Sequence, residues 1–149
     1  MRRVKKFDSE TNLQIQVADY LRLQYPNVLF HSDYGSGAKL TISQAVTQKR
    51  LNGGNKSWPD MFISKPKEIG WMEIGDNFVP TKWLHGLYIE LKKDGTRLKK
   101  KDGNWATEHI AEQAETLEKL RQAGYKAEFA VGFEQAKQII DEYLGASWK

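Results

Sequence analysis

The segment from Gly86 to Lys92 constrains the fold of this chain most strongly, because it sets a carboxylate inside an apolar strand. Its sequence is Gly-Leu-Tyr-Ile-Glu-Leu-Lys, and clustered aliphatic and aromatic residues of this kind are typical of a β-strand. Successive strand residues point to opposite faces, so Glu90 and Lys92 share one face while Leu91 lies on the other. A buried glutamate needs a partner, and the segment therefore predicts a polar site on a sheet.

A second acid stands beside another apolar run, in the sequence Trp58-Pro59-Asp60-Met61-Phe62-Ile63. Asp60 alone could be a turn acid, and Glu90 could face solvent on an edge strand. If the two strands are neighbours, the two carboxylates form an oxygen site of the kind that Mg²⁺ prefers, with positions left for water and phosphate. Lys92 could then orient or deprotonate an attacking water, or balance charge on a phosphate. This combination favours metal-assisted phosphodiester hydrolysis.

Helical spacing and turn residues divide the remaining chain into short elements. At 149 residues we expect one domain spanning 1–149. The order αβαββαβα predicts an α/β fold with a mixed central sheet and helices on both faces. We expect helices from Asp8 or Ser9 to before Pro26, from Thr41 to Leu51, from Thr107 to Gln122 and over 136–144, strands at 28–31, 58–63, 86–92 and 127–131, a turn at 33–37, and a long loop or hairpin over 64–85.

Composition narrows the function classes. The chain has no cysteine, and its three histidines lack zinc-ligand spacing, so any metal should be bound by oxygen. No apolar run is long enough to span a membrane, and the basic N-terminus lacks the features of an export signal, so we expect a cytoplasmic protein. The net charge of +4 permits an anionic partner. A basic run follows Glu90 and is either a solvated loop or a phosphate contact: Lys92, Lys93, Arg97, Lys99, Lys100 and Lys101.

These residues resemble the PD-(D/E)xK nuclease superfamily, with Pro59-Asp60 as the first motif and Glu90-Leu91-Lys92 as the second. The wider pattern is similar to the virus-type replication-repair nuclease family, VRR-NUC, over nearly the whole chain. The resemblance implies a restriction-endonuclease-like α/β fold. It is carried by a helix with Glu10, a strand ending at His31, a glycine-rich turn from Gly53 to Asp60, the strand from Gly86 to Lys92, a helix with Gln113, and Gly124-Tyr125.

The resemblance also implies roles for individual residues. Mg²⁺, for which Mn²⁺ substitutes, would be held by Asp60, Glu90 and the carbonyl of Leu91, with Glu10 acting through water. Lys92 would be catalytic, and Gln113 would order Lys92, a ligand or a water. Apart from the resemblance, the basic run adjoins the candidate metal site, and we expect it to contact nucleic acid through Lys93, Arg97, Lys99, Lys100 and Lys101.

The implied function is a Mg²⁺-dependent, structure-selective DNA endonuclease of the DNA-repair type. Small stand-alone members resemble Holliday-junction resolvases, so we expect a homodimer acting on branched or junction DNA in the cytoplasm of a bacterium or a phage-infected cell. The alternative is a non-catalytic nucleic-acid-binding domain that retains the nuclease fold. The chain departs from the family pattern at Trp58, where a small glycine is usual, in its long basic loop, and at Asp33-Tyr34. We expect Trp58 to narrow access to the site.

Overall fold

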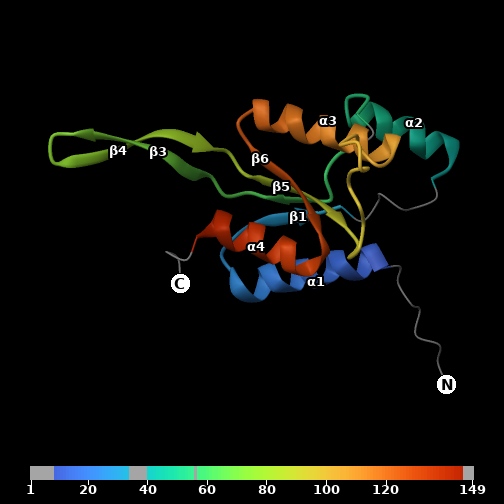
Figure 1. Ribbon diagram of the computed structural model, residues 1–149, viewed down its shortest axis with the longest axis horizontal. Coiled ribbons are helices and arrows are strands. Elements are labelled where there is room, and N and C mark those ends of the chain that lie inside the picture. Colours follow the sequence, from blue (N-terminus) through green and yellow to red (C-terminus); the bar gives the residue numbers. More distant parts are fainter. Residues whose placement is uncertain (1–8, 34–39, 56, 146–149) are drawn as a thin grey trace, which may run out of the picture.

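The computed structural model describes residues 9–33, 40–55 and 57–145. Its helices and strands confirm the α/β class expected from the sequence (Figure 1). Asp8 and most of the expected turn at 33–37 lie outside the described residues. The elements are α1 (Ser9–Gln24), β1 (Phe30–Ser32), α2 (Ile42–Leu51), β2 (Met61–Ile63), β3 (Lys67–Ile74), β4 (Asn77–Leu84), β5 (Leu87–Lys92), α3 (Glu108–Gln122), β6 (Lys126–Val131) and α4 (Gly132–Leu144).

The central sheet is mixed, as expected. Its strand order is β1-β2-β5-β6, with antiparallel pairing except between β5 and β6, which run parallel. The parallel pair requires a crossover, and α3 provides it on one face of the sheet. As a result β5, the strand that carries Glu90, lies inside the sheet between β2 and β6.

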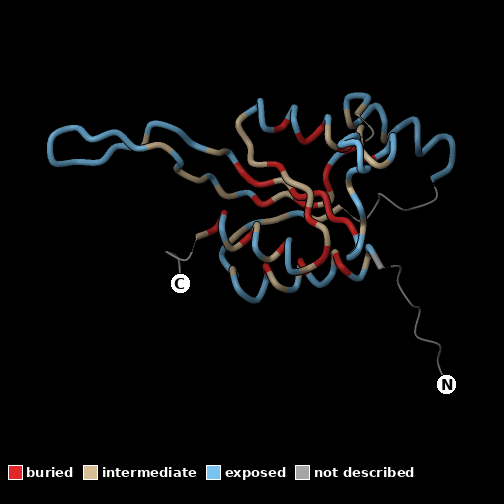
Figure 2. Tube along the Cα trace, in the orientation of Figure 1, coloured by how far each residue is buried: buried red, intermediate tan, exposed pale blue. Residues whose placement is uncertain are grey.

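Helices cover the two faces of this sheet unequally (Figures 1 and 2). Leu87, Ile89 and Leu91 of β5 are buried in one cluster with apolar residues of α1 and α4. On the opposite face, a smaller cluster joins Leu117 and Leu120 of α3 to Ala127 of β6. The alternation within β5 therefore gives one face to the core and leaves the Glu90 face beneath α3.

The helix ends follow the sequence signals in most places. Thr41 and Gln44 form the expected capping box at the start of α2, and Thr107 caps α3. The last helix begins at Gly132, earlier than the expected 136, because β6 passes directly into α4. This tight passage requires the left-handed backbone of Gly132, whose φ is 81°.

The expected order αβαββαβα is wrong in one respect, because the segment over 64–85 forms two long strands. β3 and β4 pair antiparallel through the two-residue turn Gly75-Asp76, and the hairpin projects from the body of the molecule (Figure 1). Gly75 has a φ of 61°, which a short hairpin turn of this kind requires at its first position. The observed order is αβαββββαβα.

Two strands also differ in extent from their predicted ranges. β1 covers Phe30–Ser32, and β2 begins only at Met61. Pro59 lacks an N–H group and cannot take part in a ladder, so regular pairing starts after Asp60. Within the ranges described, no helix combines the length and apolar character needed to cross a membrane.

Candidate functional site

The two acids of the motifs lie side by side on neighbouring strands. The register pairs Met61 with Ile89, which sets Asp60 opposite Glu90 on the face away from the main core. Their carboxyl groups are close enough to share a hydrogen bond when one of them is protonated. In addition, the main-chain N–H of Leu91 donates to Oδ2 of Asp60 at 2.8 Å. The sheet therefore fixes both carboxyl groups.

Gln113 reaches this pair from above the sheet. It lies on the buried face of α3, and its Nε2 donates to Oε1 of Glu90 at 2.8 Å. The side chain is 6% exposed, and its Oε1 is a buried acceptor that has no partner among the described residues. A buried acceptor of this kind is costly unless a cation, a water or another donor completes it.

Burial governs the protonation of the two acids. It raises the pKa of Glu90 to about 9, and the neighbouring charge of Asp60 adds to this effect. Burial also raises the pKa of Asp60, opposed by the N–H of Leu91, the hydrogen bond from Glu90 and the charge of Lys92. At neutral pH Glu90 of the metal-free pair is therefore protonated, and its carboxyl group donates a hydrogen bond to Asp60.

Lys92 shares the strand face of Glu90, two residues farther along β5, as the alternation predicts. Its side chain is 8% exposed, and its charge lowers the pKa of both carboxyl groups. A buried ammonium beside two acids is placed to act on an anion that enters the same space.

Glu10 lies at the outer end of the apolar stripe of α1, and its side chain is exposed. It is exposed because the first turn of α1 extends beyond the core residue Leu13. Its negative charge nevertheless raises the pKa of Asp60 and Glu90. Glu10 is thus an electrostatic neighbour of the pair.

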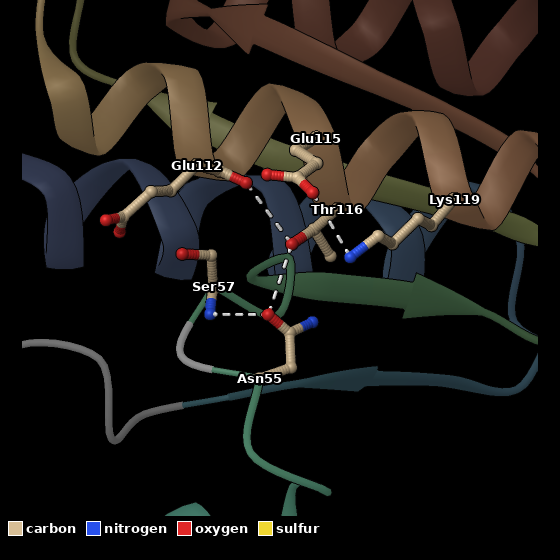
Figure 3. Close-up of polar contacts among 6 residues, drawn as sticks. All are labelled: Asn55, Ser57, Glu112, Glu115, Thr116 and Lys119. Atoms are coloured by element: carbon tan, nitrogen blue, oxygen red, sulfur yellow. Dashed lines mark hydrogen bonds and ion pairs between the residues drawn. The ribbon is translucent and has the colours of Figure 1, made fainter.

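A polar contact that the sequence analysis missed holds the segment before Asp60 against α3 (Figure 3). The Thr116 hydroxyl lies 3.3 Å from Oδ1 of Asn55, and the same oxygen accepts from the N–H of Ser57 at 3.3 Å. Thr116 follows Gln113 by three residues, which places both side chains on one helix face. This spacing indicates the helix face of Thr116, although not its contact with Asn55. One helix therefore anchors both Glu90 and the approach to Asp60.

The oxygen atoms at this site fit a metal ion that prefers oxygen ligands. Asp60 and Glu90 supply carboxylate oxygens, and Gln113 supplies a buried amide oxygen that no described residue contacts with a hydrogen bond. A strand residue directs its N–H and C=O to the same side, so the carbonyl of Leu91 faces the side on which its N–H meets Asp60. No group of three or more His, Cys, Asp or Glu side chains within the described ranges could hold a metal by itself. This set suits Mg²⁺, which takes few carboxylates, and does not suit Zn²⁺.

The basic run forms an ordered loop between β5 and α3. Its turns are closed by main-chain hydrogen bonds from Thr96 to Lys93 and from Lys100 to Asn104, and the Nζ of Lys99 lies 4.8 Å from the ring centre of Trp105. All five cations expected to contact nucleic acid have exposed side chains: Lys93, Arg97, Lys99, Lys100 and Lys101. The loop starts directly after Lys92, the last residue of β5.

Comparisons with known proteins agree with this architecture. The fold is shared with a solved "VRR_NUC domain protein", at 24% sequence identity and a TM-score of 0.56, over 93% of this chain and 90% of that one. No family model matches the sequence, and no curated protein matches it. The resemblance to VRR-NUC is thus confirmed at the level of the fold.

Proposed function

We propose that this protein is a Mg²⁺-dependent, structure-selective DNA endonuclease of the VRR-NUC family and the PD-(D/E)xK superfamily. The observation that carries the proposal is the joining of Asp60, Glu90 and Gln113 by hydrogen bonds on one sheet face, with Lys92 on the same strand face. The shared fold with a VRR_NUC domain protein supports it.

Each residue of the site has a proposed role. Asp60, Glu90 and the carbonyl of Leu91 would hold Mg²⁺, with Glu10 acting through water. The bound ion would polarise the phosphoryl oxygens and make an attacking water more acidic. Glu90 must lose its proton to act as a ligand, and Gln113 fixes the position of its carboxyl group. Lys92 stabilises negative charge on the scissile phosphate.

Branched DNA, of the Holliday-junction type handled in DNA repair, is the proposed substrate, and the active form is a homodimer that presents two sites to it. The projecting hairpin supports a second copy, because several large apolar side chains of β3 and β4 are exposed, among them Trp71 and Phe78. Light scattering with four-way-junction DNA tests this step. A protein that remains monomeric on the junction contradicts it, whether or not the DNA is cleaved.

A cleavage assay tests the enzyme itself. Purified protein is incubated with end-labelled duplexes, flaps and four-way junctions in Mg²⁺, Mn²⁺ or EDTA. We expect cleavage only with metal, and losses of at least about 100-fold in Glu90→Gln and Lys92→Met. Glu112→Gln is the control on the exposed face of α3, and Lys126→Met is the control on the neighbouring strand. Salt-sensitive binding without cleavage would instead identify a non-catalytic nucleic-acid-binding domain.

A further inference from the structure

Five aromatic rings lie beside the candidate site and form a surface that the proposed chemistry does not use. We call Trp58, Phe62, His85, Tyr88 and Tyr125 the aromatic surface. The register pairs Phe62 with Tyr88, one alternation step along the strands from Asp60 and Glu90. Two residues of a strand cover about 7 Å, so these rings flank the carboxylates on the same sheet face.

The rings are in mutual contact. Phe62 and Tyr88 stack with centroids 4.5 Å apart, and Trp58 lies 6.2 Å from Tyr88 on the ring centroids. Tyr125 meets Tyr88 edge-on, and His85 meets Tyr125 in the same way. Gly86 makes room for the Phe62 ring, because a Cβ at this glycine would lie 2.7 Å from that ring. The surface is therefore built to a fixed geometry.

Core packing explains only part of this surface. Tyr88 and Tyr125 pack against the cluster under α3. Trp58 is 42% exposed, and its Nε1 donates a long hydrogen bond of 3.5 Å to the carbonyl of Asn52. The helices α1 and α4 pack on the opposite face of the sheet, α3 packs on β6, and no helix within the described residues has comparable contacts with β1 or β2 (Figure 1). There Phe62 pairs with His31, whose side chain is exposed.

We propose that the aromatic surface binds unpaired nucleobases next to the phosphate that is cut, with Trp58 as the outermost stacking residue. Every base has a π-face, so stacking on such rings selects single-stranded nucleotides regardless of sequence. Bases inside a duplex already stack on one another and cannot occupy the rings without being extruded. The surface contains no Lys, Arg, Asp or Glu side chain, so the phosphates would be contacted by the basic loop.

This inference deepens the proposed function and rests on it, because it names the structural element of DNA that the nuclease recognises. It also revises the expectation that Trp58 only narrows the site. On this account the tryptophan replaces a small residue because it adds a stacking partner at the rim of the carboxylate pair.

The test measures binding without cleavage. Oligonucleotides with 2-aminopurine at one position, either single-stranded or in a blunt duplex, are titrated with protein in EDTA, and base fluorescence reports stacking. We expect quenching for single strands and about tenfold weaker single-strand binding in Trp58→Ala, with recovery in Trp58→Phe. Leu23→Ala is the control, because Leu23 is a large apolar side chain that is exposed, at 65%, on α1 and lies outside both the aromatic surface and the hairpin.

Two results would overturn the inference: unchanged single-strand affinity in Trp58→Ala, or an equal loss of affinity for single strands and duplex. Thermal unfolding of Trp58→Ala checks that this variant retains the fold. If it does not, the single-strand and duplex affinities of Trp58→Phe are compared with those of the wild type instead. Failure here is separable from failure of the proposed function. A protein that cleaves with Mg²⁺ yet does not stack bases refutes only the aromatic surface, whereas one that binds no DNA refutes both.

Discussion

The Oδ2 atom of Asp60 accepts the main-chain hydrogen bond of Leu91 at 2.8 Å, in the place where a strand neighbour would otherwise pair. β2 begins one residue later, at Met61, so a side chain extends the ladder between β2 and β5. The acid is consequently held by the sheet, and its second oxygen is left for Glu90 or a ligand. The carboxyl group of Asp60 therefore has a structural role and a proposed chemical role, and different substitutions of Asp60 can test the two roles separately.

Asp60→Asn should fold almost as well as the wild type and lose cleavage. Its amide oxygen can still accept from Leu91, whereas the neutral side chain is a poor metal ligand. Asp60→Ala should lose cleavage and also about 1–3 kcal/mol of unfolding free energy, because the buried N–H loses its acceptor. Urea unfolding and a cleavage assay measure the two effects. Asp76→Asn, on the exposed hairpin turn, is the control. Equal stability in the Asn and Ala variants would contradict the structural role.

Gln113→Ala should weaken Mg²⁺ binding by about 10–100-fold, as is usual when a partner that orients a ligand is removed. The substitution removes the donor to Glu90 and the unpartnered Oε1 atom together. Isothermal titration calorimetry with Mg²⁺ measures the affinity. Gln122→Ala at the exposed end of α3 is the control. An unchanged affinity, with the fold intact, would limit Gln113 to a packing role.

The metal-free protein should lose stability as the pH rises, because of Glu90. Its pKa is 4.5 when unperturbed and about 9 in the folded state. Between these values the folded state holds a proton that the unfolded state has released, so unfolding free energy falls with pH, by up to about 1.4 kcal/mol per unit. The contribution is complete below about 4.5 and lost above about 9. Unfolding in EDTA across this range measures the slope, which Glu90→Gln should flatten. If the unfolding free energies of the wild type and Glu90→Gln had the same slope against pH, the raised pKa of Glu90 would be refuted.

Much of the site geometry was predictable from local pattern. Strand alternation put Glu90 and Lys92 on one face, and helix phase put Gln113 on the buried stripe of α3. These features depend on residues close in sequence. The sequence does not distinguish a loop from a hairpin over 64–85, because the apolar side chains of the hairpin do not face a core and their pattern shows no clear inward face. The two-residue turn Gly75-Asp76 was the signal that could have resolved it.

Other features depend on contacts between distant segments. Asn55 and Thr116 are 61 positions apart, and neither residue type reveals that they meet. The exposure of Glu10 depends on where the core ends beneath α1, which no local spacing fixes. The sequence predicted which residues belong to each face, and tertiary packing determined which of them approach one another.

The basic loop should set the salt dependence of DNA binding without affecting metal binding. Arg97, Lys100 and Lys101 are exposed and follow Lys92 in the chain, so a DNA backbone at the carboxylates can reach them. Each phosphate contact removed should reduce the slope of log K against log salt by about 0.9 for duplex DNA. Fluorescence anisotropy from low to moderate salt, with single and combined Gln substitutions, measures the slope. Lys82→Gln on the hairpin is the control, and Mg²⁺ affinity should stay constant throughout. A combined variant that keeps the wild-type slope would show the loop to be solvated surface, and the phosphates would then have to bind elsewhere on the molecule.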